Sequence, residues 1–232
     1  MPNANLLLAS LSAVDTAFIS PHLKPVHLAS QRVLFDAGAT VDRVYFPSGS
    51  IVSLVVTLST GEMIEAAMVG KDGIVGASAA LDGKISLSRA IVQIGGDAMT
   101  CDLDVIRKAA MQSHPLLALL IRHEQTVYAQ AQQSAACNAT HDVEARLCRW
   151  MLRARDLSGS DTLPFTQEFL AEMIGVGRTS VSIVAHTLQQ AGLIKYARGR
   201  IQIVNLEGLQ EAACECYGTV NSHYRALLIN TR

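Results

Sequence analysis

The stretch FTQEFLAEMIGVGRTSVSIVAHTLQQAGL, residues 165–193, decides the fold of this chain. It predicts two short helices joined by a tight turn. Thr166 is expected to cap the first helix, and Gly175 supplies the left-handed backbone that a sharp turn between helices demands. The second helix is predicted to begin at Arg178. A small residue, a turn glycine and β-branched core positions in this order form the helix-turn-helix pattern.

The second helix has an outward face that follows from its period. A step of 100° per residue places its valines and leucine on one side and its polar residues opposite them. Arg178 can donate two hydrogen bonds to guanine, and Ile183 suits a thymine methyl group. An ordinary surface helix pair in an all-helical domain is the alternative. We predict DNA contacts from Gln167, Arg178, Thr179, Ser180, Ser182, Ile183 and His186.

The segment IKYARGRIQI, residues 194–203, follows directly. Two short β-prone runs flank a turn that holds two arginines and a glycine, so a small hairpin is predicted, which is a wing. Cations along such a hairpin contribute affinity for phosphates without regard to base sequence. We therefore predict contacts to the DNA backbone from Lys195, Arg198 and Arg200.

The segment from Phe165 to Ile194, together with this hairpin, resembles the Crp/Fnr superfamily of transcription regulators, which includes the cyclic AMP receptor protein and FNR. The resemblance implies a homodimer that binds a palindrome in double-stranded DNA, has RNA polymerase as a further partner and is not an enzyme. Arg178 matches the arginine that opens the family's recognition helix. Thr179 replaces a glutamate found in many members, and Ile183 replaces a second base-reading arginine, so a different DNA sequence is expected.

Short β-prone runs separated by turn residues fill the chain from Val26 to Cys101. Many short strands with regular turn signals predict a sandwich or jelly roll. The run LFDAG, residues 34–38, followed by VYF, residues 44–46, also looks like the opening of a cyclic-nucleotide-binding-type roll. The predicted fold class is α+β, with an N-terminal double-stranded β-helix, a long dimerisation helix and a C-terminal winged helix-turn-helix.

Family members that bind cyclic AMP use a short glycine-bounded helix with a glutamate for the ribose hydroxyl, and an arginine on the next strand for the phosphate. Ala77 falls at the glutamate position and Ser88 at the arginine position, and a shift of one residue along a strand turns Arg89 to the other face. These departures favour a different small-molecule effector, or none, over cyclic AMP. The predicted effector pocket comprises Gly76, Ala77, Ser78, Ser88 and Arg89.

A long helix is predicted from Pro115 to Ala136, where residues recur at three- and four-residue steps. In the resembled family this helix forms the dimer interface. The alternative is a helix packed only on its own roll, and Leu116, Leu119 and Ile121 are expected to face the roll. The predicted dimer interface comprises Leu117, Leu120, Glu124, Val127 and Ala131.

The overall composition is that of a globular protein, with 50% hydrophobic and 17% charged residues and a net charge of −1. This net charge does not indicate a nucleic-acid partner, but the local charge does, because basic residues outnumber acidic ones between Arg146 and Arg200. No apolar run approaches the length that spans a bilayer, so a cytoplasmic protein without membrane association is expected.

The histidines show no metal-ligand spacing and the five cysteines form no disulfide framework, so no metal or cofactor is predicted. The first cysteine, Cys101, lies too far along the chain for the amino-terminal cluster of the FNR branch. Cys214 and Cys216 are candidates for a thiol sensor or weak metal site. Residues two apart on a helix face away from each other, so ordinary packing is preferred.

The remaining segments complete the predicted organisation. Residues 6–20 predict one amphipathic helix. Residues 137–142 predict a hinge, in which Thr140 caps the next helix. Asn205 is expected to cap a final helix that packs across the DNA-binding domain. The expected domains are the roll at 1–112, the dimerisation helix and hinge at 113–140, and the winged helix-turn-helix with its C-terminal helix at 141–232.

Two rival functions stay open. One is a ligand-binding or protein-interaction module in which the helix-turn-helix contacts a protein instead of DNA. The other is an enzyme on the roll, for which the sequence offers no nucleophile and base pair and no metal set.

Overall fold

The computed structural model describes residues 5–81 and 83–229. Its first half is a roll of seven strands, each of which overlaps the segment from Val26 to Cys101 that was predicted to form short strands. The strands are β1 Lys24–Leu28, β2 Val33–Phe35, β3 Arg43–Pro47, β4 Ile51–Thr57, β5 Met63–Val69, β6 Arg89–Ile94 and β7 Gly96–Asp102. The predicted α+β class is confirmed.

The seven strands form two antiparallel sheets that face each other. One has the order β1-β7-β3 and the other the order β2-β6-β4-β5. Alternating residues of both sheets point inward, so Val44, Val52 and Val92 meet in a core from which water is excluded. Two short helices close the roll, α3 Ala77–Leu81 and α4 Leu103–Gln112.

The single helix predicted at residues 6–20 is wrong. The segment forms α1 Leu6–Ala9, α2 Ala13–Ile19 and a 3₁₀ turn, η1 Ser20–His22. Ser12 causes the break, because its hydroxyl accepts a hydrogen bond from the Asp15 N–H at 3.0 Å and so starts a new helix. Leu7, Leu8 and Ile19 still pack into the core of the roll.

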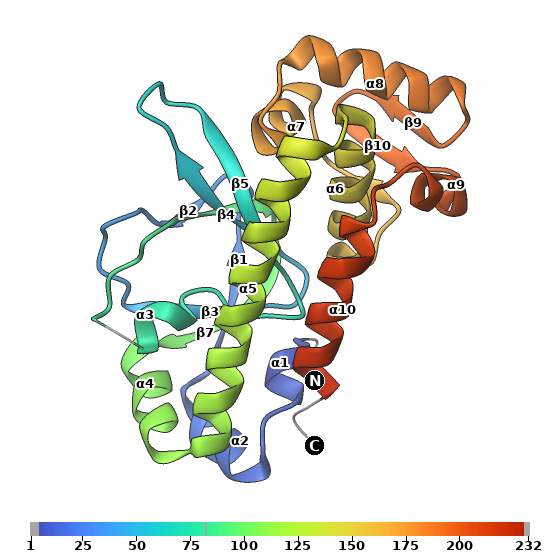
Figure 1. Cartoon of the computed structure of the whole chain (residues 1–232). Coiled ribbons are helices and arrows are strands. Elements are labelled where there is room, and N and C mark those ends of the chain that lie inside the picture. Colours follow the sequence, from blue (N-terminus) through green and yellow to red (C-terminus); the bar gives the residue numbers. More distant parts are fainter. Residues whose placement is uncertain (1–4, 82, 230–232) are drawn as a thin grey trace.

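The long helix α5 spans His114–Thr140 and runs along the roll (Figure 1). It is longer at its C-terminal end than predicted, which leaves only a two-residue link before α6 Val143–Ser158. The cap of α6 is Asp142 rather than the predicted Thr140, since the Asp142 carboxylate accepts from the Ala145 N–H at 2.8 Å. None of the helices within the described residues is long and apolar enough to cross a membrane.

The second half of the chain is built on α6. It contains β8 Thr162–Leu163, α7 Gln167–Ile174, α8 Arg178–Gln190, β9 Ile194–Ala197, β10 Arg200–Ile203 and α9 Leu206–Glu211. Trp150 of α6 centres its core, with its ring 4.8 Å from that of Phe165. Ile51, Met68 and Ile91 of the roll belong to the same hydrophobic cluster, so the two halves share apolar contacts.

The final segment departs from the prediction in two respects. The predicted single helix after Asn205 is broken into α9 and α10 Cys216–Ile229. α10 packs along α5 rather than across the DNA-binding domain, and Val220, Tyr224 and Leu227 join the core of the roll (Figure 1). Cys214 precedes α10 and Cys216 is its first residue, so the expectation that the two face apart on one helix is wrong.

Candidate nucleic-acid interface

The helix-turn-helix has the predicted local structure. The Thr166 hydroxyl caps α7 by accepting from the Phe169 N–H at 3.2 Å. Gly175 ends α7 in the left-handed conformation, with φ of 65°, and α8 begins at Arg178 as expected. Val181, Ala185 and Leu188 bury the inner side of α8. The turn and the buried side together fix which face of α8 points outward.

The outward face of α8 carries most of the predicted base contacts. Arg178, Thr179 and His186 are exposed, and Ile183 is 62% exposed although it is a large aliphatic residue. Exposure of such a side chain costs free energy in water, and contact with a thymine methyl group would recover it. Ser180 is half-buried at the start of the helix.

Gln167 and Ser182 bond to each other. The Ser182 hydroxyl donates to Gln167 Oε1 at 2.6 Å, which joins α7 to α8. The Gln167 N–H donates to the Tyr196 hydroxyl at 3.2 Å, which joins α7 to the wing. Both residues were predicted to contact DNA, and in the free protein their side chains join α7 to α8, while the Gln167 backbone joins α7 to the wing.

The wing is the hairpin of β9 and β10. Its two-residue turn is Arg198–Gly199, with φ values of 50° and 71°, which is the left-handed pair that a type I′ hairpin requires. Lys195 pairs with Gln202 and Ala197 with Arg200, so Lys195 and Arg200 share the exposed face of the hairpin. A third strand, β8, pairs with β10 and was not predicted.

Four cations lie at the end of the molecule formed by α8 and the wing (Figure 1). They are Arg178, Lys195, Arg198 and Arg200, and all are exposed. Within residues 5–81 and 83–229, none of them forms an ion pair with a carboxylate. Their charge is therefore available to an external anion.

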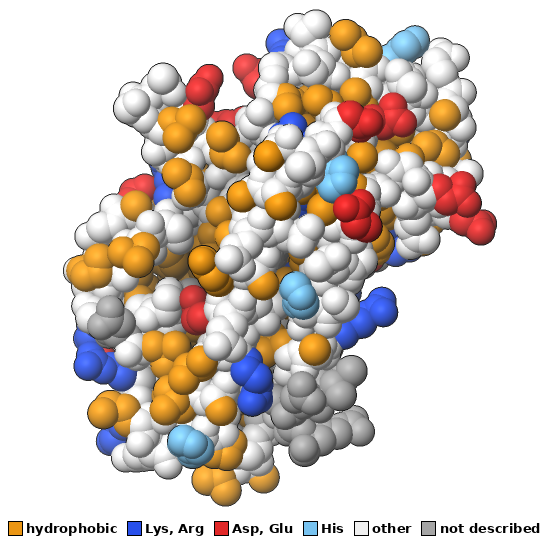
Figure 2. Space-filling view, viewed as in Figure 1, with side chains coloured by type: hydrophobic (Ala, Val, Ile, Leu, Met, Phe, Trp, Pro, Cys, Tyr) orange, Lys and Arg blue, Asp and Glu red, His pale blue; other side chains and the backbone are white. Residues whose placement is uncertain are grey.

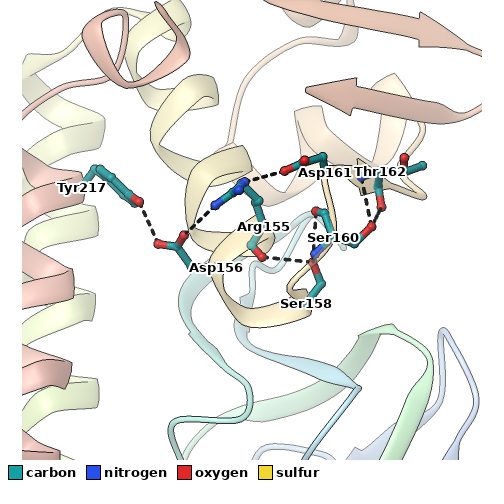
Figure 3. Close-up of polar contacts among 7 residues, drawn as sticks. All are labelled: Arg155, Asp156, Ser158, Ser160, Asp161, Thr162 and Tyr217. Carbon is teal, nitrogen blue, oxygen red and sulfur yellow. Dashed lines mark hydrogen bonds and ion pairs between the residues drawn. The ribbon is translucent and has the colours of Figure 1, made fainter. Parts of the chain in front are cut away.

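The arginines of α6 do not add to this surface. Arg146, Arg149 and Arg153 are buried, so the positive balance counted from the sequence overstates the exposed charge. Arg155 is half-buried and already paired. Its Nε donates to Asp161 Oδ1 at 2.6 Å, and its Nη1 lies 3.7 Å from Asp156 Oδ1 (Figure 3).

A buried carboxylate connects the roll to α6. Glu65 of β5 accepts from Trp150 Nε1 at 2.9 Å and from Gln93 Nε2 at 2.7 Å, and the Ser53 hydroxyl also donates to it. Burial raises the pKa of Glu65, and the Ser53 hydrogen bond and the charge of Arg149 oppose that rise. The second half of the chain therefore depends on groups inside the roll.

An ion pair forms a second connection. Arg153 Nη2 of α6 lies 2.8 Å from Asp72 Oδ2 of the roll, and both side chains are buried. In the described part of the chain, Arg153 Nη2 has no aligned hydrogen-bond acceptor, so the attraction is mainly electrostatic. The guanidinium also lies 4.2 Å from the ring centroid of Tyr224, whose hydroxyl donates to Gln130 of α5. This contact joins the roll, α5, α6 and α10.

The segment predicted to bind an effector is closely packed. Ala77 is fully buried in the core, and a side chain at Gly76 would approach the Arg43 carbonyl. Arg89 Nε lies 3.3 Å from Asp36 Oδ1, so its charge is partly neutralised. Ser78 is exposed and Ser88 half-buried. An effector pocket formed by these residues remains a prediction. The ion pair between Arg89 and Asp36 makes Arg89 less able to bind a phosphate.

The predicted dimer seam of α5 is only partly accessible. Leu120 is 1% exposed inside its own chain, so its assignment to the seam is wrong. Leu117 and Val127 are half-buried against the roll, and Glu124 and Ala131 are half-buried. The prediction that Ile121 faces the roll is also wrong, because it is exposed.

The exposed stripe of α5 lies next to the predicted seam. It repeats at four- and three-residue steps, and hydrophobic atoms are visible along this helix in Figure 2. Its members are Ile121, Gln125, Tyr128, Gln132 and Ala135.

The helix-turn-helix and the fold of the chain both have counterparts in known proteins. Residues 145–212 match the family model of the Crp-like helix-turn-helix domain. A CRP-family transcriptional regulator from Thermus thermophilus is similar at a TM-score of 0.69 and 24% identity, over 81% of this chain and 96% of that chain. FixK2 from Bradyrhizobium japonicum is similar at a TM-score of 0.70 and 15% identity, over 83% of this chain and 98% of that chain. The c-di-GMP responsive regulator CLP of Xanthomonas campestris is similar at a TM-score of 0.66 and 14% identity, over 83% of this chain and 99% of that chain.

A comparison with curated proteins gives no match. At these identities the solved structures establish the fold, and the family model establishes the helix-turn-helix within it. Residues 145–212 therefore form a Crp-like helix-turn-helix domain, the DNA-binding unit of transcription regulators, and the chain has the fold seen in regulators of the Crp/Fnr family.

Proposed function

We propose that two copies of this protein bind a palindromic operator, with α8 in the major groove and the wing along the phosphate backbone. The observation that carries this proposal is the set of four exposed cations beside the outward face of α8, none of them paired with a carboxylate of the described residues. Arg178 and Ile183 would select bases. Lys195, Arg198 and Arg200 would contribute affinity that does not depend on sequence.

The exposed stripe of α5 is the surface through which the two copies would associate. Tyr128, the aromatic residue of this stripe, is 65% exposed. A parallel pair of α5 helices would relate the two α8 helices by a two-fold axis. Half-sites about one helical turn apart, roughly 34–36 Å, would then be read together.

Regulation would act through the buried contacts between the roll and α6. Glu65 and Arg153 bind groups on both sides of that boundary, so a change in the roll alters the support of the helix-turn-helix. A signal that favours one arrangement would shift the population between binding-competent and incompetent forms. The buried Ala77 and the paired Arg89 argue for an effector other than cyclic AMP, or for none.

The protein would work by binding rather than by catalysis. It would act in the cytoplasm, where DNA and RNA polymerase are present, and RNA polymerase would be a further partner. The chain would divide into the sensor roll at 1–112, the dimerisation helix at 113–140 and the DNA-binding domain at 141–232.

The test compares two single arginine variants on cognate and random duplex DNA. Arg178→Ala is expected to cost about 1–3 kcal/mol at one base position, because it removes a base contact. Arg200→Ala is expected to weaken binding to all sequences alike, because it removes a phosphate contact. Equal losses on cognate and random DNA for both variants would contradict the assignment of roles.

A further inference from the structure

Four potential metal ligands converge where α5 ends and α10 begins. They are Cys137, His141, Cys214 and Cys216, and one ligand atom from each lies within 4.8 Å of all the others. The three cysteines are buried and His141 is half-buried. Cys137 Sγ lies 3.5 Å from Cys214 Sγ, and Cys216 Sγ lies 3.6 Å from His141 Nδ1. Residues 77 positions apart in the sequence thus supply one compact group.

These separations match a tetrahedron around a single ion. Metal–ligand distances of about 2.3 Å to sulfur and about 2.0–2.1 Å to nitrogen place two sulfurs about 3.8 Å apart and a sulfur and a nitrogen about 3.6 Å apart. The observed values of 3.5 and 3.6 Å are close to both. An iron–sulfur cluster spreads its protein ligands over several iron atoms and needs them farther apart.

The backbone holds the ligands in place. Cys137 and His141 are four residues apart at the end of α5 and so lie on the same face of the helix. Cys214 and Cys216 enter from the loop before α10 and from its first residue. Both pairs therefore reach the same point without a change in either helix.

The groups around the four ligands resemble an outer coordination shell. His141 Nε2 lies 3.3 Å from Glu215 Oε1, which is the carboxylate contact that fixes the ring of a metal-binding histidine and leaves its other nitrogen for the metal. Gln133 Nε2 donates to Cys216 Sγ at 3.0 Å. Such donors stabilise a thiolate more than a thiol.

Buried positive charge completes the surroundings. Three thiolates, one neutral imidazole and a divalent ion leave one net negative charge. Arg146 and Arg149 are buried within electrostatic reach of these cysteines. The Nε atoms of both lack a hydrogen-bond partner among the described residues. Guanidinium groups there would offset the charge of the occupied site.

We propose that Cys137, His141, Cys214 and Cys216 bind one thiophilic divalent ion, with zinc as the ion that fits the geometry best. The bound ion joins the end of α5 to the start of α10 across the His141–Asp142 link that leads to α6. It therefore restrains the position of α6, and with it the helix-turn-helix, relative to α5. Two of the four ligands, Cys214 and Cys216, lie beyond the segment that matches the helix-turn-helix family model, and the other two precede it.

The test uses the full-length protein purified under reducing conditions from zinc-containing medium. Elemental analysis is expected to find one zinc per chain, and Cys216→Ser and His141→Ala are expected to lose it. Cys101→Ala and Cys148→Ala remove buried thiols of the two hydrophobic cores and are the matched controls, expected to keep one zinc per chain.

A second measurement does not depend on the folding of any variant. Metal-free wild-type protein titrated with cobalt(II) is expected to give the visible bands of a tetrahedral ion and thiolate charge-transfer absorption, saturating at one equivalent. Its melting temperature is expected to rise with zinc. Wild-type protein without stoichiometric zinc and without tetrahedral cobalt bands would overturn the proposal, as would a Cys137–Cys214 disulfide in the protein isolated without metal.

Discussion

Replacing Lys195 and Arg200 together with alanine tests the proposed role of the wing. Both side chains lie on the exposed face of the β9–β10 hairpin, where neither is paired with a carboxylate of the described chain. The double variant should keep its fold, because the inward residues of the hairpin, Ile194, Ile201 and Ile203, are unchanged. The expected loss is therefore one of DNA affinity and of its dependence on salt.

The magnitude follows from the number of charges removed. Each neutralised phosphate contributes about 0.9 to the slope of log K against log salt concentration. A dimer that loses about four contacts should show a slope shallower by up to about 3.6. Between about 50 and 200 mM salt, the affinity of the wild type should fall up to about 150-fold more than that of the variant.

Fluorescence anisotropy on one duplex across a salt series measures this slope. The matched control is Arg107→Ala with Lys108→Ala, which removes the same charge from exposed positions of α4, at the far end of the molecule from α8 (Figure 1). An unchanged slope in the wing variant, or an equal change in the α4 control, would refute the assignment of phosphate contacts to the wing.

Two further predictions concern the boundary between the roll and α6. Arg153→Met leaves Asp72 buried without its cation and should lower the free energy of unfolding by about 3–5 kcal/mol, while adding Asp72→Asn should restore much of it. Urea unfolding measures both, and a loss below about 1 kcal/mol would show the pair to be unimportant. Because burial raises the pKa of Glu65 in the folded protein above its ordinary value of 4.5, its contribution to stability is fully present below pH 4.5 and is lost as pH rises through the folded pKa. The wild type should therefore lose stability relative to Glu65→Gln over that range, and a difference that does not change with pH would contradict the shift.

Most of the fold could be predicted from local sequence patterns. The strands of the roll were predictable because each is a short apolar run bounded by turn residues. The helix-turn-helix was predictable because Thr166, Gly175 and the apolar period of α8 all act within a few residues of one another. The exposed face of α8 follows from the same period, which is why the predicted DNA contacts at Arg178, Ile183 and His186 lie outside.

Contacts between distant segments were not predictable in this way. Helix α6 lies between the roll, α10 and its own domain, so three of its four arginines are buried, and a helical period cannot reveal burial on every side. Leu120 was assigned to the wrong face of α5 because the roll covers a wider part of that helix than one seam. β8 has only two residues, which is too short to show a periodic pattern, and it forms only because the fold places it beside β10. The meeting of Cys137 with Cys214 depends on the break before α10.

The central claim is that the outward face of α8 binds a two-fold DNA site. Selection from random duplex DNA by the purified full-length protein tests it most directly. Enrichment of a palindrome with half-sites about 10 bp apart is the predicted result, and Arg178→Ala should relax the preference at one position of each half-site. Failure to enrich any sequence, with or without cyclic nucleotides and under both reducing and oxidising conditions, would contradict the account.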